Sequence, residues 1–168
     1  MKTFWTLLSL ACSLSVTIAS PASPPLERRA KALAFRSCTA PNTVALTFDD
    51  GPYDFMNDLI DTLNKANIKG TFFFNGNNWR CIYDEAMVQS IKKAFNTGHQ
   101  LASHTWSHKD LTTLPWDQIH DEMWKTEQAI QRITGALPAF VRPPYGTYND
   151  LGSRSCWLTR TDDFELGL

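Results

Sequence analysis

Two histidines and a pair of neighbouring aspartates are the residues of this sequence with the clearest capacity for chemistry. His104 and His108 are four positions apart, a spacing that on one helical turn directs both imidazoles to the same side. With a nearby carboxylate they make a set that holds a divalent metal and leaves coordination positions open for water and substrate. A metal held in this way lowers the pKa of its bound water to about 7 and so generates a nucleophile.

Asp49 and Asp50 stand side by side and can divide two tasks between them. One can bind the metal while the other takes a proton from the water. Arg142 can hold this second carboxylate ionised and oriented through paired hydrogen bonds. The two residues after Arg142 are prolines without an N–H group, so the next main-chain donor is that of Tyr145, which can stabilise an oxyanion.

Each of these patterns also has a simpler interpretation when it is taken alone. An HxxxH spacing is more often a surface or packing pair than a metal site, and Asp50-Gly51-Pro52 makes a good turn. Arg142 can equally be a partner in a surface salt bridge, and His99 and His120 are interpreted as structural. The prediction of a site therefore depends on whether the fold brings these groups to one place.

Alternating strand and helix patterns run through residues 43–146. Short apolar and β-branched runs predict strands at 43–48, 71–74, 100–103 and 140–141. Apolar residues at helical spacing predict helices at 55–63, 87–95 and 115–135. This alternation is typical of an α/β fold with a parallel sheet, in which the carboxyl ends of the strands lie on one face. The candidate residues follow three of these strands and are therefore expected to converge.

Composition limits the class of protein. The 168 residues, 43% of them hydrophobic, suit one domain with a substantial core. Sixteen basic and 17 acidic residues give a net charge of −1, so the chain has no basic surface for nucleic acid and no such partner is expected. No apolar run reaches the roughly 20 residues that span a bilayer.

The first residues have the pattern of a targeting segment. A basic start at Lys2, an uncharged apolar stretch over 4–18 and small residues near Ala19 predict a signal peptide at 1–19, and therefore a secreted protein. Residues 20–37 are Pro-rich and are interpreted as a linker or pro-segment, and residues 38–168 as the domain. Three cysteines remain after such cleavage, an odd number, so either one thiol is free or one partner is missing.

The segments TFDDG (47–51), HTWSH (104–108) and RPPYG (142–146) follow one another along the chain. In order and spacing they resemble the first three motifs of the NodB-homology polysaccharide deacetylases, and their wider context is most similar to the fungal-type chitin deacetylases. The resemblance covers residues 43–150. It implies a deformed (β/α) barrel that removes N-acetyl groups from chitin or another N-acetylated polysaccharide and releases acetate.

The resemblance also implies a role for each candidate residue. Asp49 corresponds to the catalytic base and Arg142 to the residue that orients it. Tyr145 corresponds to the main-chain position that stabilises the oxyanion. The ligands of a divalent metal, zinc or alternatively cobalt, correspond to Asp50, His104 and His108. Cys38 resembles a family cysteine that pairs with one near the C-terminus.

The sequence departs from the family pattern after Asp150. The family continues with a Trp-containing fourth motif and a fifth Leu-x-His motif whose histidine acts as general acid, whereas no histidine follows His120 here. We interpret the chain as a truncated or mis-spliced product, divergent from residue 151 and incomplete at the C-terminal end of its barrel. Losing a general acid typically costs about 10²–10⁴-fold in rate, so weak or absent turnover is expected.

The sequence thus favours a secreted or cell-wall-associated, monomeric, metal-dependent chitin deacetylase. Two alternatives remain open. One is an inactive glycan-binding module or non-functional fragment that keeps the metal ligands without turnover. The other is an iron-dependent oxygenase, since two histidines and a carboxylate also hold Fe(II), although such sites commonly lie on β-sandwich folds.

Overall fold

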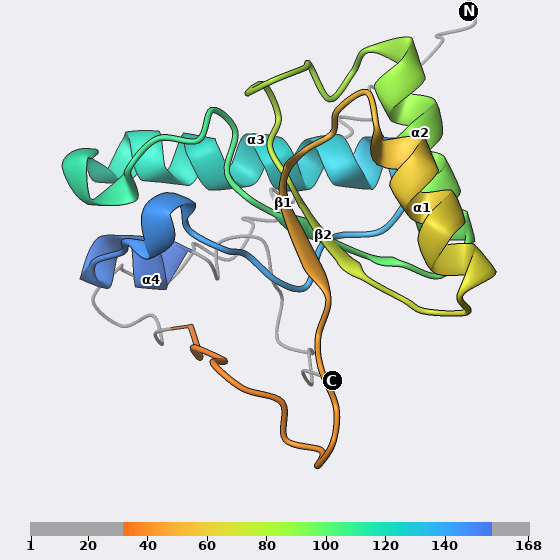
Figure 1. The fold of residues 1–168 in the computed structure, drawn as a ribbon. Helices are drawn as coiled ribbons and strands as arrows, with labels where there is room; N and C mark the ends of the chain where they lie inside the picture. The colour runs from red at the N-terminus through yellow and green to blue at the C-terminus, as the bar shows by residue number, and fades with distance from the viewer. Residues whose placement is uncertain (1–31, 156–168) are drawn as a thin grey trace, which may run out of the picture.

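The computed structural model describes residues 32–155, which form a parallel sheet with helices packed along it (Figure 1). The strands β1 (Thr47–Gly51), β2 (Thr71–Phe74) and β3 (Gln100–Ser103) are hydrogen-bonded in the order β1-β2-β3. The helices are α1 (Met56–Lys65), α2 (Glu85–Asn96), α3 (Trp116–Thr134) and the short α4 (Asp150–Ser155). The predicted signal peptide and Cys156 lie outside the described residues.

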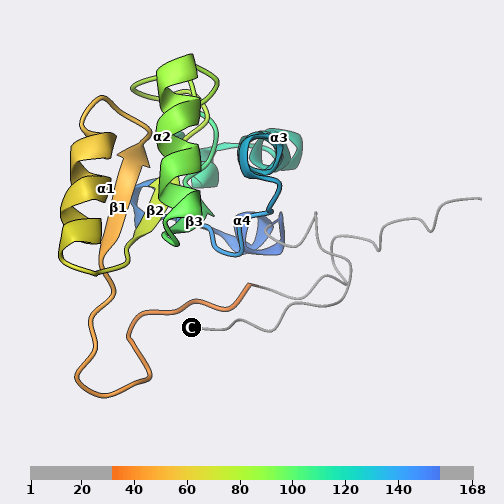
Figure 2. The ribbon, with the colours of Figure 1, turned by 90° about the vertical axis from the view of Figure 1, so that its right-hand side faces the viewer.

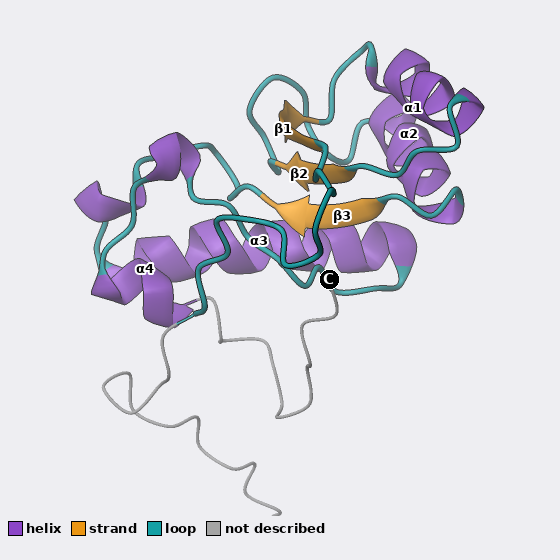
Figure 3. Cartoon of the chain, turned by 60° about the horizontal axis from the view of Figure 1, so that its bottom comes forward, coloured by secondary structure: helices purple, strands orange, loops and turns teal. Residues whose placement is uncertain are grey.

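The three long helices follow one another along the sheet. α1 packs against α2, and α2 against α3, which also contacts β3. Figure 2 shows α1 and α2 side by side, with α3 seen almost end-on, and Figure 3 shows α3 running along the β3 edge. In the described residues no helix is both long and apolar enough to cross a membrane.

Apolar side chains with helical and strand periodicity build the core between these layers. Ile60 of α1, Ile91 of α2 and Ile130 of α3 are almost fully buried against Phe72 and Phe74 of β2. α3 ends at Gly135, whose φ of 84° is left-handed and whose N–H caps the carbonyl of Gln131. The predicted strand–helix alternation and the parallel pairing are therefore confirmed, and so are the predicted bounds of β2 and β3.

The first strand lies further along the chain than predicted. β1 is Thr47–Gly51 rather than 43–48, so Asp49 and Asp50 lie within the strand and not after it. Its pairing with β2 is regular at Thr47 and Phe48 and shifts between Phe48 and Gly51. Aspartate is a poor strand former, so the sequence pattern ends at Phe48 while pairing with β2 carries the strand through both aspartates.

The fourth strand predicted at 140–141 is not formed. Val141 makes only an isolated parallel bridge to Ser103, next to a pair of hydrogen bonds that Ser103 exchanges with Phe140 and Arg142. The two residues after Arg142 are prolines, which have no N–H group to donate to the next bonds of a ladder. Pairing therefore stops after one bridge, although it still brings Arg142 to the end of β3.

Candidate metal centre

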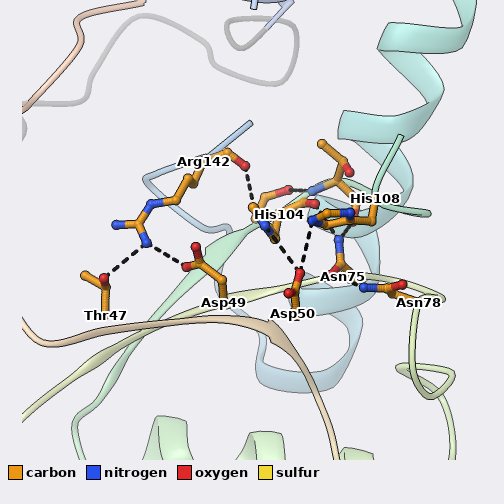
Figure 4. A network of polar contacts seen from close by, with 10 residues as sticks. Thr47, Asp49, Asp50, Asn75, Asn78, His104, His108 and Arg142 are labelled. Carbon is orange, nitrogen blue, oxygen red and sulfur yellow. Dashed lines mark hydrogen bonds and ion pairs between the residues drawn. The ribbon is translucent and has the colours of Figure 1, made fainter. Parts of the chain in front are cut away.

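Three chain segments bring their polar side chains together at one edge of the sheet (Figure 4). Asp49 and Asp50 come from β1, His104 and His108 from the loop after β3, and Arg142 from the segment bridged to Ser103. The convergence predicted from strand order is what the structure has, even though β1 starts later than expected.

Asp50, His104 and His108 form one compact group of possible metal ligands among the described residues. Oδ1 of Asp50 lies 3.5 Å from Nε2 of His104 and 3.1 Å from Nε2 of His108, and one ligand atom of each residue lies within 4.8 Å of the others. Asp50 reaches this position with a left-handed φ of 66°, a conformation that a non-glycine residue adopts only when its surroundings impose it.

The proton of His104 is on the nitrogen that points away from Asp50. Its Nδ1 lies 2.6 Å from the carbonyl oxygen of Arg142, an atom that can only accept a hydrogen bond, so Nδ1 carries the hydrogen. Burial lowers the pKa of His104 below its ordinary value and outweighs the opposing effect of the Arg142 carbonyl. The ring is therefore neutral near pH 7, and Nε2 presents a lone pair to Asp50.

This arrangement of atoms fits a cation. The lone pair on Nε2 of His104 faces Oδ1 of Asp50, which is an acceptor as well, is buried and has no hydrogen-bond partner in the described part of the chain. Two acceptors that face each other repel unless a positive charge lies between them. The Arg142 carbonyl also holds His104 in the tautomer that metal ligation needs, as outer partners of metal-binding histidines commonly do.

Asp49 points to the other side of β1, and its partner is Arg142 rather than a histidine. Nη1 of Arg142 donates a 2.6 Å hydrogen bond to Oδ1 of Asp49 and a 3.1 Å bond to Oγ1 of Thr47. The guanidinium carbon lies 4.1 Å from the centre of the Phe73 ring, which fixes its position. The adjacent aspartates therefore have separate surroundings, one with an arginine and one with two imidazoles.

Tyr145 lies beside the same group, in the short 3-10 turn Pro144–Gly146. Its φ is 59°, and its main-chain N–H has no hydrogen-bond partner among residues 32–155. The residue is 70% exposed, and its ring packs edge-on against His108, with ring centres 4.9 Å apart. The turn is tied to the loop after β3 by a 2.9 Å hydrogen bond from Oγ1 of Thr147 to Oδ1 of Asp110.

The two histidines do not share a helical turn, contrary to the expectation from their spacing. Residues 104–108 form an irregular loop, with left-handed φ values of 70° at Thr105 and 57° at His108. The fully buried Asn75 stabilises this loop, since its Nδ2 donates to the carbonyl oxygens of His104 and Thr105. Sequence reasoning missed Asn75, although an amide directly after the apolar strand β2 carries the same positional signal as His104.

A mostly apolar pocket of about 380 Å³ lies next to the aspartates. Asp49 and Asp50 form part of its lining, and three aromatic side chains complete it with large exposed areas. These are Tyr53, Phe55 and Trp79, which are 42%, 73% and 66% exposed. Tyr53 contacts each of the other two rings, so the aromatic groups form a continuous surface beside the polar centre.

Two of the three cysteines outside the predicted signal peptide lie in the described residues. Cys38 is exposed and Cys81 is partly buried, and within residues 32–155 neither forms a disulfide. Cys156 lies outside the described residues, so the pairing of the three cysteines stays open.

Comparison with known proteins places this geometry in a family. Residues 36–155 match the family model described as polysaccharide deacetylase. The chain is 45% identical over 136 residues to a chitin deacetylase of Pestalotiopsis sp, covering 79% of this chain and 45% of that protein. It is 37% identical over 155 residues to a chitin deacetylase of Colletotrichum lindemuthianum, covering 89% of this chain and 62% of that protein.

A comparison with solved structures also finds a chitin deacetylase. The chitin deacetylase structure from Colletotrichum lindemuthianum superimposes with a TM-score of 0.68 at 38% identity, over 70% of this chain and 52% of that one. The chain thus spans about half the length of the relatives it matches. The expected fold class, the α/β deformed barrel of the polysaccharide deacetylases, is confirmed, with three parallel strands of it in the described residues. The chain belongs to the polysaccharide deacetylase family.

Proposed function

We propose that this protein hydrolyses N-acetyl groups on chitin or chito-oligosaccharides and releases acetate. The observation that carries the proposal is the division between two neighbouring aspartates. Asp50 faces two imidazoles, whereas Asp49 is paired with Arg142. A hydrolase that activates water needs these two functions, a cation site and a separate proton acceptor, within a few ångströms of each other.

Asp50, His104 and His108 are the residues that would hold the metal, and zinc suits their nitrogen and oxygen donors, with cobalt as a substitute. The chemistry that such a metal supplies is activation of a water molecule and polarisation of the acetyl carbonyl. The family membership of the chain supports a metal at this place, and so does Oδ1 of Asp50, which is buried without a hydrogen-bond partner among residues 32–155.

Asp49 is the residue that takes the proton from the attacking water. Its hydrogen bond with Arg142 orients the Asp49 carboxylate, and a carboxylate held in this way can accept a proton. As the water oxygen bonds to the acetyl carbon, negative charge develops on the carbonyl oxygen. The main-chain N–H of Tyr145 would stabilise this charge, and its lack of a partner among the described residues supports that role.

Cleavage of the carbon–nitrogen bond then leaves acetate and a free amine, and the amine nitrogen needs a proton. Once protonated, Asp49 can return its proton to that nitrogen.

The substrate class follows from the aromatic surface and the names of the relatives. Sugar rings pack on aromatic faces, and Tyr53, Phe55 and Trp79 offer such faces beside Asp49. Relatives with 45% and 37% identity are named chitin deacetylases, and others with 47% and 40% identity are named peptidoglycan-N-acetylglucosamine deacetylases, so the names share N-acetylglucosamine polymers as a substrate class. A substrate of this kind is outside the cell, in agreement with the secretion predicted from residues 1–19.

Acetate release from acetylated chito-oligosaccharides tests the proposal. We expect release that requires added zinc or cobalt and that falls by about 10²–10⁴-fold in D49N, because asparagine cannot accept the proton. D54N is the matched control, since Asp54 is a half-exposed carboxylate that pairs with Arg80. Measurable oligomer binding with no acetate release at any metal loading would reject the enzyme and favour a glycan-binding module.

A further inference from the structure

A carboxylate on the far side of the loop at residues 104–108 has no part in the chemistry described above. Glu122 belongs to α3 and is only 6% exposed, although it lies among apolar positions of the helix such as Ile119 and Met123. Burial of a charged group costs free energy unless hydrogen bonds compensate for it. Its hydrogen bonds come from Ser107, in the loop at residues 104–108.

Ser107 donates two hydrogen bonds to Glu122. Its main-chain N–H lies 2.7 Å from one carboxylate oxygen and its Oγ lies 2.5 Å from the other. Two bonds from a single residue fix both its peptide group and its side chain. The ammonium group of Lys109 lies 3.6 Å from the same carboxylate, so three donor groups of residues 107–109 gather around Glu122.

The loop needs such support because its backbone is strained. Left-handed φ values at Thr105 and His108 are costly for residues with a side chain, and they persist only when the surroundings impose them. Asn75 holds the first half of the loop through the carbonyls of His104 and Thr105. Glu122 holds the second half, so one anchor directly follows β2 and the other lies in α3.

The two imidazoles differ in how they are oriented. His104 has its own partner, the Arg142 carbonyl. Nδ1 of His108 has no hydrogen-bond partner in the part of the chain that the structure describes. Its ring packs edge-on with the rings of His104 and Tyr145, and its Nε2 lies 3.1 Å from Oδ1 of Asp50. The position of His108 therefore depends on its backbone. The residue directly before it, Ser107, is the one that Glu122 holds.

We propose that Glu122 is a positioning residue for the metal site, which acts through Ser107 to place His108. This inference rests on the proposed function, because it assumes that His108 is a metal ligand. Loss of the anchor lets the strained loop relax, so His108 no longer meets Asp50 and His104 at the separation that a shared cation requires.

Metal binding by the full chain tests this role directly, with Co²⁺ as a spectroscopic probe and Zn²⁺ in competition. E122A should weaken the affinity for both ions by about 10–100-fold, the usual effect of losing an outer partner of a metal ligand. It should also change the visible absorption spectrum of bound Co²⁺, because the spectrum reports the ligand set. E122Q should retain most of the affinity, since an amide can accept from the Ser107 N–H and donate to its hydroxyl.

Two further variants separate positioning from folding. S107A removes only the hydroxyl bond and should cause a smaller loss of affinity, which keeps the proposal testable if E122A does not fold. D121A is the matched control, because Asp121 is an exposed neighbour that pairs with Lys125, and it should bind Co²⁺ as the wild type does. A folded E122A with wild-type affinity and spectrum would overturn the proposal, and so would E122Q and E122A that are equally impaired.

Measurements of metal binding and of acetate release together distinguish a failure of this proposal from a failure of the proposed function. A wild-type chain that binds Co²⁺ but releases no acetate rejects the hydrolase while leaving the effect of Glu122 on metal affinity measurable. A wild-type chain that binds neither ion rejects both.

Discussion

The main-chain carbonyl oxygen of Arg142 lies 2.6 Å from Nδ1 of His104 and so orients this imidazole. The guanidinium group of the same residue binds Asp49. The two contacts use different parts of Arg142, since one belongs to the backbone and the other to the side chain. A change of the side chain should therefore separate the two functions of the site.

Removal of the Arg142 side chain should impair hydrolysis without loss of metal. In R142A the carbonyl that holds His104 is still present, so the Zn²⁺ affinity should stay close to that of the wild type. Acetate release should fall by about 10–100-fold, because Asp49 loses the partner that orients it. R142K should recover only part of the activity, since an ammonium group cannot reproduce the planar contact with Asp49, Thr47 and the Phe73 ring. A parallel loss of metal in R142A would show that the side chain supports the metal site as well.

The buried His99 should make folding stability depend on pH. Burial, with a smaller effect of Lys69, lowers the pKa of His99 below its ordinary value of 6.5. Its Nδ1 accepts a 3.1 Å hydrogen bond from the N–H of Gly70, so the folded state needs the neutral ring. Between the lowered pKa and 6.5 the unfolded chain binds a proton that the folded chain does not, so stability is lost as the pH falls through this window.

H99N is the variant that isolates this effect, because the amide oxygen can replace Nδ1 as acceptor and does not titrate. Urea unfolding in the presence of a chelator, between about pH 7.5 and pH 5, should show a smaller decline in the free energy of unfolding for H99N than for the wild type. All other titratable groups are the same in the two proteins, so their effects cancel in the comparison. Equal declines would mean that His99 does not contribute.

Gly76 should be irreplaceable because the Trp106 ring occupies the space of a side chain. A Cβ on Gly76 would lie 1.8 Å from Cε3 of Trp106, whereas the same addition at Gly152 meets nothing closer than 3.8 Å. G76A should lower the free energy of unfolding by about 1–3 kcal/mol, the usual cost of overpacking, and G152A should not. If the ring is the cause, the effects of G76A and W106A in urea unfolding will not add in the double variant. Additive effects would point to a different origin.

The sequence predicts the neighbourhood of the site because strand order alone brings its members together. Asp50 belongs to β1 and His104 directly follows β3, and in a parallel sheet such positions share one edge. The apolar run at 71–74 and the stop at Gly135 were sufficient to place β2 and the end of α3, because both are local signals.

The conformation of the loop that carries the histidines depends on distant partners, and the sequence could not predict it. The HxxxH spacing fits a helical turn, but Thr105 and His108 adopt left-handed φ values that Asn75 and Glu122 support from other elements. Glu122 does leave a local signal, a carboxylate three residues after Ile119 on the apolar face of a predicted helix. The same dependence on a partner explains β1, whose two aspartates join the strand because β2 pairs with it.

The central claim is that Asp50, His104 and His108 hold one divalent cation beside an Asp49 that does not bind it. Zinc stoichiometry after equilibrium dialysis tests this claim most directly, with D50A and D49A as a matched pair of neighbouring variants. The account predicts about one zinc per chain in the wild type and in D49A, and almost none in D50A, as for the loss of a ligand from a three-residue site. A wild-type chain without zinc, or a D50A variant that retains it, would contradict the account.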